Sequence, residues 1–249
     1  MTGGSHGIGL ATARSLAKAG ADIVICSRSK TRLSTAAKEI SRSNVDVIAL
    51  ECDVLDKHSI QNVWNQIESE CGGVDILINN VGGGGRWGKN SPLDTPLETW
   101  NEVMQMNSGS AIQFTMLALP WMLKANWGRV ICITSIYGSI VGGKPWFNMA
   151  KVSQSVLMKN LAQKKEFTRK GVTFNNVAPG AIMIPETGWD VMQRNQPLKY
   201  KEFLDELPLG RLGSPEEVAA LVLFLCSKNS GYINGASITI DGGESLSLN

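Results

Sequence analysis

The chain has 249 residues, of which 43% are hydrophobic and 18% charged, and its formal net charge is +2 at pH 7. This length suits one large α/β domain, and the charge includes no basic run of the kind that a nucleic-acid groove needs. The longest apolar stretch, residues 218–226, is far shorter than the roughly 20 residues of a membrane-spanning helix. Five scattered cysteines and two histidines form no disulfide or metal pattern. We therefore expect a cytoplasmic protein without a metal, nucleic-acid or membrane partner.

Short β-branched runs alternate with longer helical patterns along the whole chain. The expected strands are 22–27, 45–50, 74–79, 129–134, 172–177 and 237–240, and the expected helices lie near 7–19, 30–41, 56–70, 98–124, 147–168 and 216–227. This alternation predicts right-handed crossovers and a parallel sheet with helices on both faces. Apolar strands such as VDILIN and VICIT fit strands that are buried on both faces. The fold class is therefore α/β, a doubly wound parallel sheet in a single domain.

A long connection between the fifth strand and the last helix interrupts this pattern. Residues 181–210 contain three prolines, with Trp189 and Met192 among polar residues. A long irregular connection in a compact domain is usually functional. We expect this segment to be a substrate loop or lid.

A glycine-rich turn, TGGSHGIG at residues 2–9, leads directly into the first helical stretch. The bare backbone N–H groups of such a turn, together with the helix dipole, attract an anion. The spacing of Gly3, Gly7 and Gly9 differs from the commonest dinucleotide fingerprint, so this turn alone is weak evidence. It indicates a phosphate-binding loop.

Further motifs follow the glycine turn along the chain. They are CDV at 52–54, NNVG at 79–82, Asn107 in the long helix, GRVICITS at 128–135, Lys151, NNVAPG at 175–180 and INGASITIDGG at 233–243. With these motifs the chain resembles the short-chain dehydrogenase/reductase family over essentially its whole length. Within the family it is most similar to reductases of the β-ketoacyl carrier-protein type. The resemblance implies a Rossmann-like sheet that binds a nicotinamide dinucleotide beyond the carboxyl ends of its strands.

The resemblance also assigns residues to the cofactor. The set is Gly3, Ser5, His6, Gly7, Ile8 and Gly9 at the pyrophosphate and ribose, Asp53 and Val54 at the adenine, Asn80, Val81 and Gly82 at the adenosine ribose, and Pro179, Gly180 and Ile182 along the nicotinamide. For the glycines, close helix–strand packing is an alternative role that is compatible with cofactor binding. One departure is Ile184, which stands where the family commonly has a threonine that bonds the cofactor.

The turn after the expected strand 22–27 bears on the choice of cofactor. NAD-selective members of such folds place a carboxylate here to accept from the ribose 2′-hydroxyl. This chain has Ser27 and Arg28 instead, with Arg32 one helical turn further on. A guanidinium can bind a 2′-phosphate with charge-assisted hydrogen bonds, although a solvated surface arginine is the alternative. We expect NADP(H) rather than NAD(H).

The resemblance implies four catalytic positions, and one of them is altered. Asn107 would anchor a proton-relay water, Ser135 would hold the substrate oxygen, and Lys151 would bind the nicotinamide ribose. The family's proton-donating tyrosine falls on Phe147, which has no proton to give. If the segment is a helix, Phe147 and Lys151 still lie one turn apart on one face.

Three explanations of Phe147 stay open. The residue was introduced to silence the enzyme, or it is natural in a subfamily with another donor, or it marks a cofactor-binding protein without catalysis. Tyr137, two residues after Ser135, is a candidate donor, although a loop tyrosine that packs elsewhere is the commoner case. The function expected first is an NADP(H)-dependent oxidoreductase acting on a carbonyl or alcohol, silenced or slowed by Phe147. The alternative is a non-catalytic NADP(H)-binding scaffold.

Three further expectations concern substrate, assembly and the start of the chain. Trp87, Trp146 and Trp189 flank the catalytic motifs, and we expect them to converge on a substrate pocket. Two long apolar helices, near 100–122 and 147–167, predict a homo-oligomer, by resemblance a homotetramer. The family has a hydrophobic strand before TGG, so we expect the natural chain to start upstream of Met1, unless the flanking strands pair directly.

Overall fold

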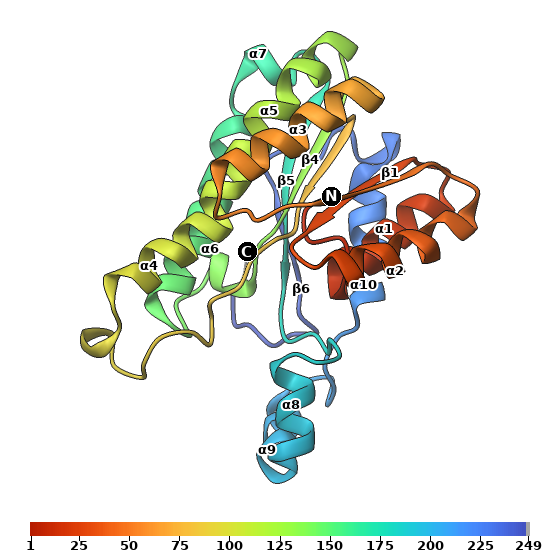
Figure 1. The fold of residues 1–249 in the computed structure, drawn as a ribbon. Helices are drawn as coiled ribbons and strands as arrows, with labels where there is room; N and C mark the ends of the chain where they lie inside the picture. Colours follow the sequence, from red (N-terminus) through yellow and green to blue (C-terminus); the bar gives the residue numbers. More distant parts are fainter. Residues whose placement is uncertain (248–249) are drawn as a thin grey trace.

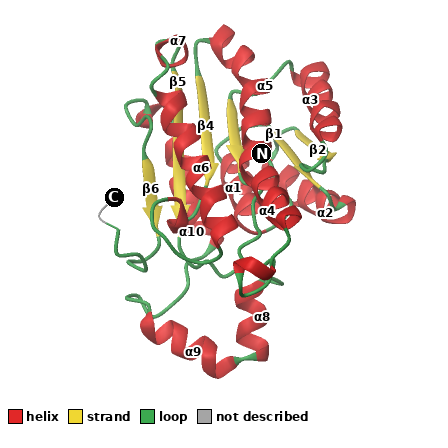
Figure 2. Ribbon diagram, turned by 90° about the vertical axis from the view of Figure 1, so that its left-hand side faces the viewer, coloured by secondary structure: helices red, strands yellow, loops and turns green. Residues whose placement is uncertain are grey.

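In the part of the chain that the structure describes, six parallel strands form the middle layer, and helices cover both of its faces (Figures 1 and 2). The computed structural model describes residues 1–247. The strands are β1 (Ile23–Ser27), β2 (Val47–Glu51), β3 (Ile76–Asn79), β4 (Gly128–Ile133), β5 (Val172–Pro179) and β6 (Ser237–Ile240). All six expected strands are confirmed, with ends that differ by one or two residues at most. The four inner strands, β1, β3, β4 and β5, are mostly buried, as strands covered on both faces are. The edge strands β2 and β6 are half-buried or exposed at most positions.

The helices divide into two layers. One face of the sheet packs against α1 (Gly7–Lys18), α2 (Lys30–Ile40) and α10 (Pro215–Cys226), and the other against α3 (Lys57–Cys71), α5 (Ser110–Ala125) and α6 (Pro145–Ala162). The short helix α7 (Lys165–Thr168) follows α6. Each layer has its own apolar cluster: Ile25 and Val222 belong to the first, and Trp64 and Phe114 to the second. The expected doubly wound, Rossmann-like architecture is confirmed.

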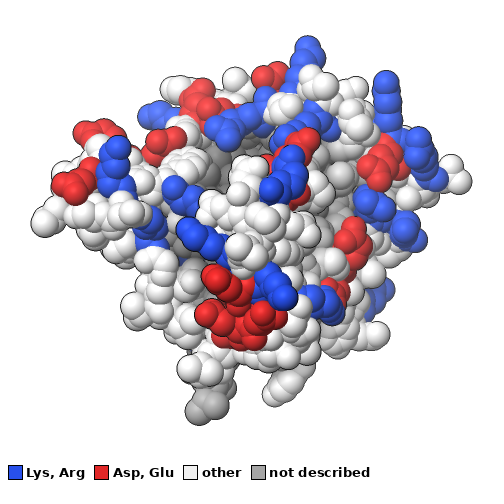
Figure 3. All heavy atoms as spheres, turned by 90° about the horizontal axis from the view of Figure 1, so that it is seen from below, with Lys and Arg blue, Asp and Glu red and all other residues white. Residues whose placement is uncertain are grey.

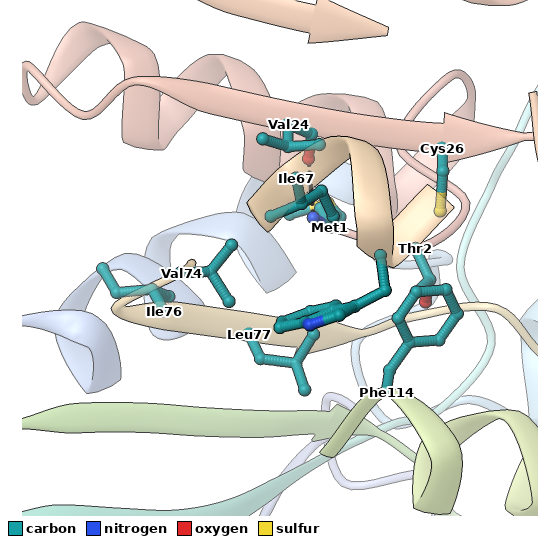
Figure 4. Close-up of a pocket in the computed structure, with 10 residues that line it drawn as sticks. Met1, Thr2, Val24, Cys26, Ile67, Val74, Ile76, Leu77 and Phe114 are labelled. Atoms are coloured by element: carbon teal, nitrogen blue, oxygen red, sulfur yellow. Dashed lines mark hydrogen bonds between the residues drawn. The ribbon is translucent and has the colours of Figure 1, made fainter. Parts of the chain in front are cut away.

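The sheet is divided between β1 and β3. The strands hydrogen-bond as two separate sets, β1-β2 and β3-β4-β5-β6. Met1–Gly3 lies between the two sets: the Thr2 N–H donates to the Ile78 carbonyl at 3.0 Å, and the Cys26 N–H donates to the Met1 carbonyl at 3.1 Å. The label N in Figure 2 marks this position, between the strands of the larger set and β1. Figure 4 shows Met1 and Thr2 there in close-up, between the two flanking strands. Direct pairing of the flanking strands is therefore not observed, and the expectation of an upstream start stays a prediction.

Two expected elements differ in detail from the structure. The long helix expected near 98–124 is two helices, α4 (Leu97–Met104) and α5, joined by a π-helical turn over Gln105–Gly109. The connection 181–210 was expected to be irregular, which is wrong in part, because it contains α8 (Gly188–Asn195) and α9 (Pro197–Glu206). These two helices project from the rest of the molecule at the bottom of Figure 1. Within residues 1–247, no helix has both the length and the apolar character needed to cross a membrane.

Candidate active site

The glycine turn leads into the N-terminus of α1 beside the carboxyl ends of β1 and β3. Gly3 has φ +64°, a conformation that other residues rarely adopt. His6 precedes the helix with an extended backbone, and its ring Nε2 bonds the Pro185 carbonyl at 2.8 Å rather than capping the helix. The first N–H groups of α1 therefore face the cleft, where they suit an anion.

Two adjoining cavities extend along this edge of the sheet. The first, of about 240 Å³, is lined by Gly3, Ser5, His6, Cys26, Ser27, Arg28, Cys52, Val54, Asn80, Val81, Gly82 and Met106. The second, of about 290 Å³, is lined by His6, Gly7, Ile8, Asn80, Gly82, Gly83, Ile133, Thr134, Phe147, Lys151, Ile184 and Thr187. His6, Asn80 and Gly82 line both, so the two cavities form one continuous cleft. The structure thus brings together most of the residues that the resemblance assigned to a cofactor.

The first cavity ends at the turn after β1. The Ser5 hydroxyl donates to the Ser27 hydroxyl at 2.8 Å, and Arg28 is exposed at the rim. Arg32 instead bonds Glu186 at 2.8 Å, across the cleft. Positive and negative side chains are interspersed over the face seen from below (Figure 3), so no broad field of one sign covers it. Any charge selectivity at this end must come from individual side chains.

A buried polar cluster forms the wall of the second cavity. The Lys151 ammonium donates to the Ile133 carbonyl at 3.1 Å and to the Gln154 side-chain oxygen at 3.0 Å. Burial lowers the pKa of Lys151 to about 8, because desolvation disfavours the charged form more than the nearby Cys132 thiol favours it. Lys151 therefore gives up its proton more readily than an exposed lysine does.

Gly82 lets the backbone approach this cluster closely. A Cβ at position 82 would lie 2.6 Å from the Asn107 Oδ1 and 2.8 Å from the Lys151 Nζ. Both distances are shorter than real contacts allow, so only glycine fits without displacing one of the two polar groups. The site therefore depends on a bare backbone here, as a ligand-facing loop does.

Asn107 lies in the π-helical turn between α4 and α5. Its amide nitrogen donates to the Val103 carbonyl at 2.8 Å and to the Gly83 carbonyl at 3.0 Å, and its Oδ1 accepts from the Gly83 N–H at 3.2 Å. The Asn107 carbonyl accepts from Gln154 at 3.0 Å. Such π turns occur frequently at functional sites. Here the turn links the loop after β3 to the helix that carries Lys151.

Phe147 faces the second cavity from the first turn of α6. The Lys151 Nζ lies 5.7 Å from the centre of its ring, which confirms the expected one-turn spacing on a shared face. The Tyr137 ring meets the Phe147 ring edge-on, with 6.3 Å between centres. Tyr137 therefore packs beside Phe147 and not in a remote loop contact.

Ser135 lies two residues after the end of β4 and caps a short 3-10 turn over Ile136–Gly138. Its hydroxyl oxygen accepts from the Tyr137 N–H at 3.2 Å. A serine hydroxyl that accepts a bond keeps its own O–H as a donor. Ser135 lines neither of the two cavities. The same holds for four residues that the resemblance assigned to the cofactor: Asp53, Pro179, Gly180 and Ile182. Ile182 is buried and forms a bridge with Gly213.

None of the three tryptophans lines either cavity. The expected place of Trp146 in a substrate pocket is wrong, and for Trp87 and Trp189 it stays a prediction. Trp146 is fully buried, and its indole N–H donates to the Gly84 carbonyl at 3.1 Å. Trp189 stacks on Phe203 within the α8–α9 segment, with ring centres 4.3 Å apart. Trp87 is 36% exposed. Neighbouring positions 146 and 147 of one helix point in different directions, so only one of them can face the cleft.

The structure adds residues that the sequence did not single out. Gln154 holds both Lys151 and the Asn107 carbonyl, and Thr187 lines the second cavity beside Ile184. The spacing of Lys151 and Gln154, three residues apart on a helix, could have indicated their contact. No comparable signal marks Thr187. Within residues 1–247, no group of three or more His, Cys, Asp or Glu side chains could hold a metal ion.

Comparisons with known proteins agree with this geometry. Residues 3–245 match the family model described as enoyl-(acyl carrier protein) reductase. The chain is 36% identical to a 3-oxoacyl-(acyl-carrier-protein) reductase of Aquifex aeolicus, over 98% of this chain and 95% of that protein. It is 29% identical to a 7alpha-hydroxysteroid dehydrogenase of Escherichia coli, over 100% of this chain and 94% of that one.

Solved structures show the same likeness. L-sorbose reductase from Gluconobacter frateurii, complexed with NADPH and L-sorbose, matches with a TM-score of 0.89 and 30% identity, over 100% of this chain and 96% of that one. An actinorhodin polyketide ketoreductase with NADPH matches with a TM-score of 0.90 and 27% identity, over 99% and 96% of the two chains. The glycine turn, the Lys151 and Asn107 cluster and these likenesses lead to one conclusion: the chain belongs to the short-chain dehydrogenase/reductase family of oxidoreductases.

Proposed function

We propose that this protein is an NADP(H)-dependent oxidoreductase that transfers hydride between nicotinamide and a carbonyl or alcohol substrate, slowed by Phe147. The observation that carries the proposal is the continuous cleft, which extends from Arg28 at one end to Phe147 and Lys151 at the other. Two solved relatives contain NADPH. The direction and the substrate class follow the reductases among those relatives.

The residues of the cleft fit a dinucleotide phosphate. The N-terminus of α1 suits the pyrophosphate, and Gly82 leaves room where any side chain would meet Asn107 and Lys151. Arg28, exposed at the rim of the first cavity, would bind the 2′-phosphate. When bound, the nicotinamide supplies or accepts the hydride.

The protein's own polar groups would position the reactants. Lys151 would donate to the ribose hydroxyls of the cofactor, while Gln154 and the Ile133 carbonyl hold its side chain in place. Asn107 would hold the loop at Gly83 in a fixed position relative to α6. Ser135 would donate its free O–H to the substrate oxygen.

Proton transfer is the step that this site lacks. Phe147 fills the place of the proton donor, since its ring lines the cavity one turn from Lys151. A positioned general acid typically contributes about 10²–10⁴ in rate. Turnover should therefore be slow but measurable, because positioning and the Ser135 hydrogen bond remain. If Phe147 abolishes turnover entirely, the protein is the cofactor-binding scaffold instead.

The test is NADPH oxidation by the native protein and by Phe147→Tyr, measured against a panel of carbonyls. The panel contains a 3-oxoacyl thioester, a ketose and a ketosteroid, one for each kind of relative. The proposal expects slow oxidation of at least one substrate by the native protein and faster oxidation by the variant. If both forms bind NADPH and neither reduces any carbonyl, the oxidoreductase proposal is wrong.

The same proposal includes self-association through α5 and α6. Both helices expose apolar side chains, among them Met116 at 43% and Val156 at 52%. Isologous pairing of such helices is a common way to cover them. The homotetramer expected from the family would use this face, in the cytoplasm, where the five free cysteines would stay reduced.

Light scattering tests this assembly. The native protein should be larger than a monomer at micromolar concentration, and Val156→Asp should reduce its mass, because a charge in a paired apolar face has no partner. Val141→Asp, at an exposed residue outside these helices, is the matched control and should leave the mass unchanged. A native monomer would contradict the proposed assembly.

A further inference from the structure

Gln154 joins the helix of Lys151 to the π-helical turn at Asn107. It lies in α6 and is completely buried, with 0% of its surface exposed. Its side-chain oxygen accepts from the Lys151 ammonium at 3.0 Å, and its side-chain nitrogen donates to the Asn107 carbonyl at 3.0 Å. An ammonium only donates and a carbonyl only accepts, so a single orientation of the amide satisfies both partners. Gln154 is therefore a bridge of fixed direction.

The bridge fills the hydrogen-bonding capacity of the Asn107 carbonyl. This oxygen has two lone pairs, and it accepts from Gln154 and, at the longer distance of 3.3 Å, from the Ser110 hydroxyl. Both N–H groups of the Asn107 side chain are bonded as well, to the carbonyls of Val103 and Gly83. A water that connected the Asn107 carbonyl to Lys151 would have to displace the amide of Gln154. The side chain thus occupies the place where such a water would bind.

At its other end, the bridge fixes the direction of the Lys151 ammonium. Of the three N–H groups, one is bonded to Gln154 and one to the Ile133 carbonyl at 3.1 Å. Lys151 also lines the second cavity, so the third N–H is left for a ligand on that side. The titratable group that acts on Lys151 is the Cys132 thiol of β4, and burial raises its pKa to about 12, so it carries no charge near neutral pH. The partners that hold the charge of Lys151 are therefore neutral.

The contribution of each neutral partner is large for this reason. Burial alone disfavours the ammonium, and no opposite charge compensates for it. Hydrogen bonds to a charged group are stronger than bonds between neutral groups, so the loss of one acceptor should favour the uncharged amine. Gln154 supplies one of two such acceptors, and it is the one that a substitution can remove.

We propose that Gln154 is a positioning residue in the place of a bridging water, which keeps Lys151 charged at neutral pH and directs one N–H of Lys151 into the cleft. Lys151 in turn binds the cofactor, so Gln154 extends the pH range over which the cofactor is bound tightly. The part that concerns Lys151 itself does not need catalysis or a ligand. The part that concerns the cofactor rests on the proposed function.

The first test needs neither cofactor nor substrate. Urea unfolding from pH 5 to 10 compares the native protein with Lys151→Met, and each variant at position 154 with the same variant carrying Lys151→Met. The difference in the free energy of unfolding starts to rise at the pH where folded Lys151 loses its proton, near 8 in the native protein. Gln154→Met fills the same space without a strong acceptor, so the rise should begin about one to two pH units lower. Gln154→Ser leaves room for a water that bridges the same two groups, so the rise should stay within roughly half a unit of the native value.

Gln163→Met is the matched control for this test. Gln163 caps the end of the same helix and is exposed, so the substitution should leave the rise at the native pH. If Gln154→Met also leaves it there, Gln154 only packs and the proposal is overturned. If Gln154→Ser moves it as far as Gln154→Met does, no water can replace the amide, which overturns the place assigned to Gln154. Should either variant fail to fold, Gln154→Glu has the same shape and should move the rise to higher pH, because a carboxylate favours the charged form of Lys151. An unchanged pH in that variant overturns the proposal as well.

The second test is fluorescence titration with NADPH at pH 5.5 and pH 7.5. At pH 7.5 Gln154→Met should bind NADPH about three- to tenfold more weakly than the native protein, since a neutral amine forms a weaker bond than an ammonium. The gap should be smaller at pH 5.5, where Lys151 is charged in both proteins, and Gln154→Ser should resemble the native protein at both values. A gap of equal size at both pH values would mean that Gln154 affects binding by packing alone, which overturns its effect on the cofactor. If no form binds NADPH, the proposed function is wrong, and the unfolding test still decides the role of Gln154.

Discussion

The two walls of the cleft are built in different ways. The inner wall, at α6, holds Lys151 through buried bonds to Ile133 and Gln154. The outer wall is formed by Ile184 and Thr187, just before α8. This segment is held by exposed contacts, such as the ion pair of Arg32 with Glu186 and, on α8, Arg86 over the Trp189 ring at 5.2 Å. Exposed ion pairs contribute little to stability, whereas a buried polar group that loses its partner is costly. The inner wall is therefore fixed in position, and the outer wall can adjust to a substrate.

The largest expected effect tests whether the inner wall lacks only the hydroxyl group of the proton donor. Phe147→Tyr should raise kcat by about 10²–10⁴ on a suitable carbonyl, because Lys151 is already one turn away. The NADPH affinity should barely change. The gain should disappear when Lys151→Met is added, since the new phenol then has no neighbouring charge to lower its pKa. If the native protein is already fast and the tyrosine adds nothing, another donor acts, and Tyr137 is the first residue to replace.

The second prediction distinguishes the roles of Arg28 and Arg32 in NADPH binding at the other end of the cleft. Arg28→Ala should weaken NADPH binding about 10- to 150-fold, the value of a charge-assisted bond of roughly 1.5–3 kcal/mol. NADH binding should change little. Arg32→Ala is the matched control and should cost less, because the Arg32 guanidinium is bonded to Glu186. Equal affinity of the native protein for NADPH and NADH, measured by fluorescence titration, would contradict the assignment of Arg28.

The third prediction concerns the pH dependence of the inner wall. The pKa of Lys151 is lowered to about 8 by burial, so between about pH 8 and its ordinary value of 10.5 the unfolded chain binds a proton that the folded protein does not. Stability rises with pH wherever the unfolded state binds more protons. The free energy of unfolding of the native protein, relative to Lys151→Met, should therefore increase over this window by up to about 3 kcal/mol. Urea unfolding of both proteins at pH 7 to 10 measures the difference, and a constant difference would show that folding does not lower the pKa of Lys151.

The smallest expected effect concerns the outer wall. Arg86→Ala removes the contact with the Trp189 ring, which is worth about 0.5–1 kcal/mol at an exposed site. KM should rise about two- to fivefold while kcat stays the same, because the α8–α9 segment is then held less firmly beside the cleft. Arg86→Lys, which keeps the charge over the ring, should recover most of the loss. A fall in kcat with unchanged KM would mean that Arg86 acts on the inner wall instead.

The sequence predicted the inner wall better than the outer wall, for physical reasons. The one-turn spacing of Phe147 and Lys151 needs only a helix, and the strands are apolar runs long enough to be recognised. The three prolines of residues 181–210 favour an irregular connection, but one of them, Pro197, occupies the first turn of α9, where proline is well tolerated. The stacking of Trp189 on Phe203 depends on that helical turn and could not be read from the chain.

The burial of the strands has a consequence for how the molecule opens. Every residue of β4 and β5 is buried, whereas β2 has one buried residue among five and lies at the edge of the sheet. Native proteins open in cooperative units that often coincide with supersecondary motifs. The β1–α2–β2 motif is such a unit, and its amides should exchange with solvent earlier than those of β4 and β5, well below the energy of global unfolding.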